Sequence, residues 1–227
     1  MAATRPEALA EAGSVPRLDF EIVDGGTLEY AAAPSLRFGL RIESVRGQPI
    51  RSIMLETQIQ IPARRRSYDT ATEVRLAEVF GAPHQWASTL RTLPWLRTTQ
   101  VVPPFTGSTV VDIPVPCTYD FEVTASKYLD AVRDGEVPIE FLFGGTFFYA
   151  GADGRLQTGR IGWDQEVEYR LPARVWRETM DRYFPDTPWL RLRRDTFDRL
   201  YAYKARNTLT SWESTIDSLL RAAGEDG

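Results

Sequence analysis

The stretch that decides the fold is LRFGLRIE, residues 36–43, in which every second side chain is apolar. Successive side chains of a β-strand point to opposite faces, so this alternation predicts a strand with one buried face and one solvated face. The same period of two returns in residues 18–22 and 53–61. Such strands favour an antiparallel sheet, because parallel strands are buried on both faces and read as continuous apolar runs.

Further strand signals lie downstream and are separated mostly by turn residues. They fall at residues 98–102, 110–115, 119–123, 137–149 and 156–171. Gly144 and Gly145 interrupt the longest run and predict a β-bulge there. About eight strands joined mostly by turns predict a mainly β protein, an antiparallel β-sandwich with a helical insertion and a C-terminal helical extension.

The chain divides into three parts by its pattern. Residues 1–16 are rich in alanine and glutamate and predict a flexible N-terminal tail. Residues 17–171 form the predicted sandwich, whose helical insertion lies near residues 70–93. Residues 172–227 form the predicted extension, which opens with apolar side chains at helical spacing.

Composition argues against several classes of protein. The 227 residues carry a formal net charge of −4, which speaks against a surface that grips nucleic acid or anionic lipid as a whole. The single cysteine, Cys117, forbids an internal disulfide. The longest uncharged apolar run, residues 141–152, is shorter than the roughly 18 residues of a membrane helix, and residues 1–16 lack the apolar core of a signal peptide. We therefore expect a cytoplasmic protein with no membrane partner.

The residues that usually carry catalysis are scarce. His84 is the only histidine, so zinc sites built from several histidines and cysteines cannot form within one chain. The sequence contains no nucleophile elbow and no glycine-rich phosphate loop. We therefore predict no cofactor, no metal and no catalytic residue. The alternative of an enzyme with a carboxylate-based site, between the sandwich and the inserted helices, stays open.

A run of three arginines, Arg64, Arg65 and Arg66, ends the first block of strands. Arginine suits planar contacts with carboxylates, so the run is a candidate surface for binding an acidic partner. The alternative is a solvated strand end, which is the usual role of such a run.

Residues 189–224 combine an alternating stretch with two amphipathic helical patterns, the second opening on a predicted Thr210–Glu213 capping box. This order resembles a ribbon-helix-helix DNA-binding module, whose strands pair across a dimer and enter the major groove. The resemblance implies that Trp189, Arg191 and Arg193 face the bases. The alternative is a helical hairpin that packs on the sandwich.

The whole chain also resembles an uncharacterised family from high-GC bacteria. The resemblance lies in residues 141–149, 161–164 and 176–185. Of the 27 basic residues, 25 are arginine, which fits a high-GC genome. Genes of this family are associated with nickel–iron hydrogenase genes, so the resemblance implies an accessory role in hydrogenase assembly.

The first hypothesis is therefore a non-catalytic accessory or scaffold protein that binds a protein partner. The alternatives are a DNA-binding regulator that uses the C-terminal segment and an enzyme with a carboxylate site. The sequence leaves the oligomeric state and the strand order open.

Overall fold

The computed structural model describes residues 15–117, 123–162, 164–185 and 192–225. It divides into two compact units, Met1–Pro188 and Trp189–Gly227. Within these described ranges no helix is both long enough and apolar enough to cross a membrane.

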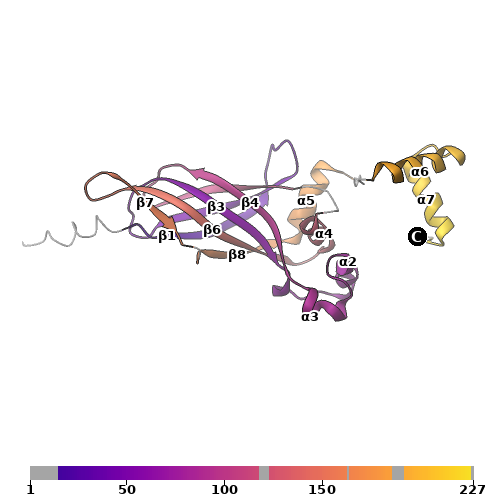
Figure 1. Ribbon diagram of the computed structural model, residues 1–227, viewed down its shortest axis with the longest axis horizontal. Coiled ribbons are helices and arrows are strands. Elements are labelled where there is room, and N and C mark those ends of the chain that lie inside the picture. The colour runs from indigo at the N-terminus through magenta and orange to yellow at the C-terminus, as the bar shows by residue number, and fades with distance from the viewer. Residues whose placement is uncertain (1–14, 118–122, 163, 186–191, 226–227) are drawn as a thin grey trace, which may run out of the picture. The chain divides into compact units, whose positions relative to one another are not determined.

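The first unit is a sandwich of two antiparallel sheets (Figure 1). One sheet has the order β1-β2-β5, formed by β1 (Leu18–Thr27), β2 (Ser35–Ser44) and β5 (Ser108–Pro116). The other has the order β4-β3-β6-β7, and β8 also pairs with β6; its strands are β3 (Ile50–Pro62), β4 (Thr92–Val102), β6 (Glu136–Ala150), β7 (Leu156–Ile161) and β8 (Glu166–Pro172). The prediction of a mainly β, antiparallel sandwich of about eight strands is confirmed.

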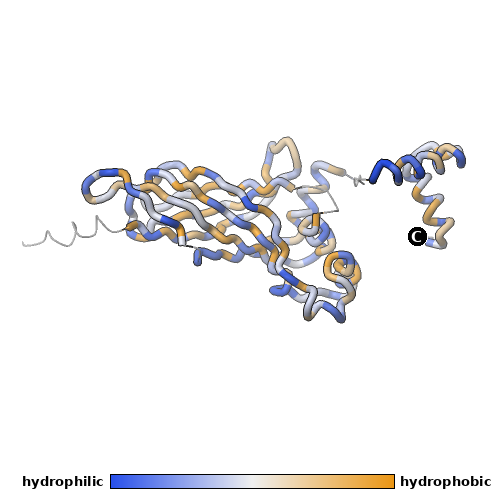
Figure 2. Tube along the Cα trace, in the orientation of Figure 1, coloured by the Kyte–Doolittle hydropathy of each residue, from blue (hydrophilic) through white to orange (hydrophobic). Residues whose placement is uncertain are grey.

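The alternation in β2 places its apolar side chains in the core. Leu36, Phe38, Leu40 and Ile42 have no exposed surface, and hydrophobic and hydrophilic positions alternate along the strands (Figure 2). Phe38 joins the two sheets, because its ring meets that of Phe141 edge-on at 5.0 Å between centroids. Burying each such side chain stabilises the fold by about 1.5–3 kcal/mol.

Strand β6 is the central strand of the larger sheet and pairs with three others. It pairs with β3 along one side; on its other side it pairs with β8 as far as Leu142 and with β7 from Gly145 onward. The register with β3 runs unshifted through Gly144 and Gly145, so the bulge predicted there is wrong. The two glycines instead mark the place where β6 changes its neighbour, and Gly145 has a φ of 120°.

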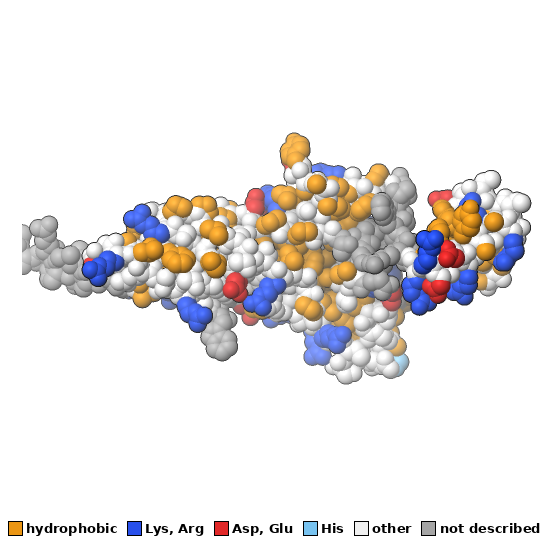
Figure 3. Space-filling model, turned by 45° about the horizontal axis from the view of Figure 1, so that its top comes forward, with side chains coloured by type: hydrophobic (Ala, Val, Ile, Leu, Met, Phe, Trp, Pro, Cys, Tyr) orange, Lys and Arg blue, Asp and Glu red, His pale blue; other side chains and the backbone are white. Residues whose placement is uncertain are grey.

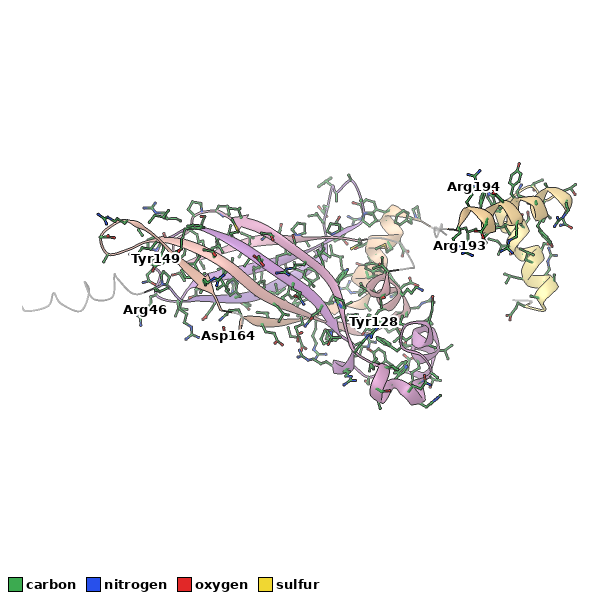
Figure 4. All side chains as sticks on the ribbon, viewed as in Figure 1. Arg46, Tyr128, Tyr149, Asp164, Arg193 and Arg194 are labelled. Carbon is green, nitrogen blue, oxygen red and sulfur yellow. The ribbon has the colours of Figure 1, made fainter. Side chains whose placement is uncertain are left out.

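Helices gather at one end of the sandwich (Figure 1). They are η1 (Ala63–Arg65), α2 (Thr70–Phe80), η2 (Pro83–Gln85), α3 (Trp86–Thr89), α4 (Thr124–Ala131) and α5 (Ala173–Tyr183). Asp69 caps α2 by accepting a hydrogen bond of 2.8 Å from the Thr72 amide. Tyr68 and Tyr128, the latter labelled in Figure 4, hydrogen-bond through their hydroxyls at 2.8 Å. The inserted helices end at Thr89, and β4 begins six residues before the predicted strand at 98–102.

Helix α5 packs with the sandwich. Its apolar stripe buries Val175, Trp176 and Met180, and the Thr179 hydroxyl lies 2.7 Å from that of Thr27 in β1. The apolar stripe at the start of the predicted extension thus packs on the sandwich, and the first compact unit continues to Pro188.

The second unit contains α6 (Arg194–Arg206) and α7 (Trp212–Ala223). The predicted capping box lies one residue downstream of its expected place. Ser211, not Thr210, is the N-cap of α7; its hydroxyl accepts from the Ser214 amide at 3.0 Å, and the Ser211 amide donates to the Ser214 hydroxyl at 3.2 Å.

Candidate functional site

Two of the three arginines predicted to bind a partner donate hydrogen bonds to backbone carbonyls of their own chain. Arg64 donates to the carbonyls of Leu90 and of Ala87, the latter at 3.4 Å, at the end of α3. Arg66 donates to the carbonyl of Asp134 at 2.6 Å, just before β6, and to that of Glu136 at 2.7 Å, at the start of β6. Both side chains therefore tie the arginine run to segments that are distant in the sequence.

Arg65 lies over a row of carboxylates on the larger sheet. Its guanidinium is 2.7 Å from Glu140, 2.9 Å from Glu168 and 3.4 Å from Glu166. The register creates this row, because Glu140 in β6 lies directly between Gln60 in β3 and Glu168 in β8. The Gln60 amide also donates to the Glu140 carboxylate.

The electrostatics of the row depend on Glu140, which is only 5% exposed. A hydrogen bond and charge repulsion from Glu140 raise the pKa of the Glu166 carboxyl. The hydrogen bond to Glu168 and the charge of Glu140 raise the pKa of Arg65. A carboxyl of raised pKa next to a second carboxyl is the arrangement a general acid needs, but here a single guanidinium contacts all three side chains. This ion-pair network is best explained as structural, and the described residues contain no His, Cys, Asp and Glu group of metal-binding arrangement.

Cys117 is buried at the end of β5, and its thiol donates to the Val115 carbonyl at 3.3 Å. Burial raises the pKa of the thiol to about 12 from its ordinary value of 9.0. His84 lies exposed in η2.

The burial of Cys117 predicts slow alkylation of the native protein. At pH 8 about one thiol in ten is ionised at the ordinary pKa, against about one in ten thousand at the raised value, and only the thiolate reacts. We expect iodoacetamide to modify native Cys117 at least about 100-fold more slowly than in 8 M urea, measured by mass spectrometry. Equal rates in both states would show that the thiol is accessible.

A cavity of about 230 Å³ opens between the two sheets where β1 begins and β7 ends. Leu18, Phe20, Phe147 and Ile161 give it apolar walls, and Arg17, Arg160 and Gln165 also line it. No sequence pattern predicts this cavity, because its walls come from the two ends of the sandwich sequence.

The C-terminal apolar face is the set of five large side chains that α6 and α7 leave exposed. They are between 37% and 58% exposed: Phe197, Tyr201, Ile216, Leu219 and Leu220. Trp212 lies beside Phe197 and Tyr201, with ring centroids 5.3 and 6.3 Å apart. Figure 3 shows hydrophobic side chains grouped on this unit, with basic and acidic side chains next to them.

Charge differs between the two helices. The bounds of α6 include four basic residues and two acidic ones, whereas those of α7 include two acidic residues and one basic one. Lys204 of α6 stays near the aromatic cluster, with its ammonium 5.7 Å from the centre of the Trp212 ring. The unit thus presents an apolar surface with a basic helix on one side.

The residues implied to read DNA are only partly described. Trp189 and Arg191 lie outside the described residues. Arg193, labelled in Figure 4, is the N-cap of α6, and its exposed guanidinium lies 3.7 Å from Asp195. Residues 192 and 193 are not in a strand.

One comparison with known proteins covers nearly the whole chain. The model of a family of unknown function, DUF6084, matches residues 15–227. The chain belongs to the DUF6084 family. No curated protein matches this DUF6084 sequence.

Solved structures similar to this DUF6084 member are distant. A late embryogenesis abundant protein is 17% identical with a TM-score of 0.34, covering 73% of this chain and 76% of its own. The CARDB domain of a Pyrococcus furiosus protein, solved with two metal ions, is 8% identical with a TM-score of 0.26. The match covers 69% of this chain and 92% of that domain's chain. The ApaA protein of Bordetella pertussis is 11% identical with a TM-score of 0.27. The match covers 70% of this chain and 96% of the ApaA chain. None of these likenesses carries an argument about function.

Proposed function

We propose that this DUF6084 protein is a non-catalytic, cytoplasmic accessory or scaffold protein whose C-terminal apolar face binds a protein partner. The observation that carries the proposal is the exposure of five large apolar side chains on a unit of only two described helices. A unit this small cannot bury a core of its own, and exposed apolar groups of this kind are typical of interaction sites.

The aromatic cluster provides the expected centre of the interface. Tryptophan and tyrosine are enriched among the residues that carry most of the binding energy in protein interfaces, and here Trp212 and Tyr201 lie together. The basic excess of α6 favours a partner whose apolar strip has acidic residues beside it.

The arginine run is less suited to this role than the sequence indicated. Arg64 and Arg66 are engaged with backbone carbonyls, and Arg65 with three carboxylates, all within the chain. Releasing them to a partner would break contacts that hold the inserted helices and β8. The C-terminal apolar face is therefore the better candidate.

The resemblance to a family associated with hydrogenase genes suggests a specific partner. In this form of the proposal, the C-terminal apolar face binds a hydrogenase subunit or a maturation protein, and the sandwich is the rigid support.

The test compares full-length proteins that differ only in exposed apolar residues. The first variant carries Ile216→Ser, Leu219→Ser and Leu220→Ser; the control carries Val74→Ser, Val101→Ser and Val110→Ser, which are exposed on the sandwich unit. Each tagged protein is purified from cells of the source organism, and the proteins recovered with it are quantified by mass spectrometry. We expect at least one partner to be recovered with wild type and control and to fall about tenfold or more with the first variant, since three apolar contacts are lost.

Equal recovery from the first variant and the control would contradict the proposal. Circular dichroism of both variants checks that α7 is retained, and light scattering of the wild type shows whether the partner is a second copy.

A further inference from the structure

We infer that the partner of the C-terminal apolar face is a second copy of this chain, joined by a two-fold pairing of the units that contain α6 and α7. The inference rests on the proposed function and names the occupant of the same face. Three features of the unit support it: its lack of a core, its contiguous apolar residues and the charges beside them.

The C-terminal unit has no core of its own. It spans about 40 residues, Trp189–Gly227, and chains of this size usually need a disulfide, a metal or oligomerisation to be stable. Of the residues in α6 and α7, all of them described, only Thr215 is buried. The sequence of the unit contains neither cysteine nor histidine, so a disulfide or a zinc site of these ligands cannot replace a core. Pairing with a second copy would supply one.

The members of the C-terminal apolar face are contiguous across both helices. Phe197 and Tyr201 lie one turn apart on α6, and their rings lie beside the Trp212 ring. On α7, Trp212, Ile216 and Leu220 follow one another at intervals of one turn and share one side of the helix. Two such units laid face to face place four helices around one shared apolar core.

The apolar area suits a dimer. The five side chains of the face are between 37% and 58% exposed, which at about 200 Å² for a large side chain leaves on the order of 400 Å² of apolar surface per copy. An interface of ordinary size buries about 800 Å² per partner, of which about 65%, or roughly 500 Å², is apolar in homodimers. The C-terminal apolar face supplies most of that area.

The α6 side of the face is basic. Arg193, the N-cap of α6, precedes Phe197 by one turn, and Arg194 precedes Tyr201 by two turns, so the two arginines flank the aromatic pair (both are labelled in Figure 4). Their side chains are 83% and 89% exposed and pair with exposed aspartates at 3.7 and 3.3 Å. Such exposed ion pairs are weak, so both guanidiniums are available to a partner.

The α7 side of the face is acidic. Glu213 precedes Leu220 by two turns and therefore lies in the same row of the helix. Asp217 lies one turn beyond Glu213, next to that row. A two-fold axis through the face sets the α6 side of each copy against the α7 side of the other, so arginines meet carboxylates twice. The face is thus complementary to itself in charge as well as in apolar surface.

The experiment is sedimentation equilibrium of the purified full chain, with no other protein present. We expect the wild type to dimerise with a dissociation constant of about 10 μM or below. The triple variant Ile216→Ser/Leu219→Ser/Leu220→Ser should dimerise at least about tenfold more weakly, whereas the triple valine control on the sandwich unit should match the wild type.

Two charge variants test the pairing itself. The basic variant carries Glu213→Lys and Asp217→Lys, and the acidic variant carries Arg193→Glu and Arg194→Glu. Each variant alone sets like charges against each other across the two-fold axis, and we expect each to dimerise at least about tenfold more weakly than the wild type. Their equimolar mixture brings opposite charges together again and should form a heterodimer nearly as tight as the wild-type dimer. Variants that fail to fold would not show this recovery.

A wild type that stays monomeric at about 100 μM overturns the inference. The proposed function then still stands if the recovery of a partner from cells depends on the C-terminal apolar face, and both fail if it does not. A dimer that survives the triple serine substitution in α7, or a mixture of the charge variants that associates no more tightly than its components, also overturns the inference.

Discussion

Replacing Gly145 with alanine is expected to destabilise the sandwich by about 4 kcal/mol or more, as much as any single substitution in the chain. Gly145 has a φ of 120°, a backbone conformation that residues with a side chain rarely adopt. A Cβ at this position would lie 2.0 Å from the Met54 carbonyl oxygen in β3, so β3 and β6 would have to move apart. The free energy of unfolding in urea, followed by tryptophan fluorescence, measures the loss.

The neighbouring glycine is the control. A Cβ on Gly144 would meet no atom within 4 Å, and the φ of Gly144 is not positive. We expect Gly144→Ala to change the unfolding free energy by less than about 1 kcal/mol. Similar losses of unfolding free energy for the two alanine variants would show that the close approach of β3 does not explain the need for glycine at position 145.

Replacing Arg65 with glutamine is expected to destabilise the protein by about 3 kcal/mol at pH 7, because it leaves the buried charge of Glu140 without its cation. Glu166 and Glu168 then add repulsion, since both contact the same guanidinium in the wild type. Arg170→Gln is the control: Arg170 is about as exposed as Arg65 but contacts only Glu168 of this row, which is itself partly exposed, and not the buried Glu140, so its loss should cost less than about 1 kcal/mol.

The effect of Arg65→Gln should depend on pH with a defined sign. Glu140 already raises the pKa of the Glu166 carboxyl, and Arg65 opposes this rise, so in the variant the folded state binds a proton at Glu166 more tightly than the unfolded state does. The destabilisation is then largest at neutral pH and shrinks as the pH falls through about 4, because the Glu166 carboxyl becomes protonated in both states. Unfolding curves at pH 4 and pH 7 measure this, and Arg65→Gln/Glu140→Gln should recover about half of the loss at pH 7. An unfolding penalty that is independent of pH would rule out a charge effect.

The strand pattern could be predicted wherever one face of a strand is buried. In β2 and β3 the alternation of side chains is regular, because one face meets the other sheet and the other meets water. The start of β4 was missed, because Thr92–Arg97 mixes proline, tryptophan and leucine without a clean alternation. The bulge expected at Gly144 and Gly145 was wrong, because Gly145 instead allows β3 to approach β6 closely without an extra residue.

The candidate sites were less predictable than the fold. The run Arg64–Arg66 is visible in the sequence, but its role depends on partners that are 23 to 103 residues away. The row of carboxylates exists only because the register sets Glu140 beside Glu168. The apolar pattern of α7 predicted an amphipathic helix, and only the structure shows that α6 does not cover Ile216, Leu219 and Leu220 within this unit.

The sequence by itself determined the class of the fold, since the period of side-chain alternation is a local property that each strand carries alone. It also excluded a zinc site built from several histidines and cysteines of one chain, because His84 and Cys117 are single. The tertiary structure alone decided the strand order, the engagement of Arg65 and the cavity between β1 and β7. These features join residues that are far apart in the chain, and only the packing of the two sheets brings such residues together.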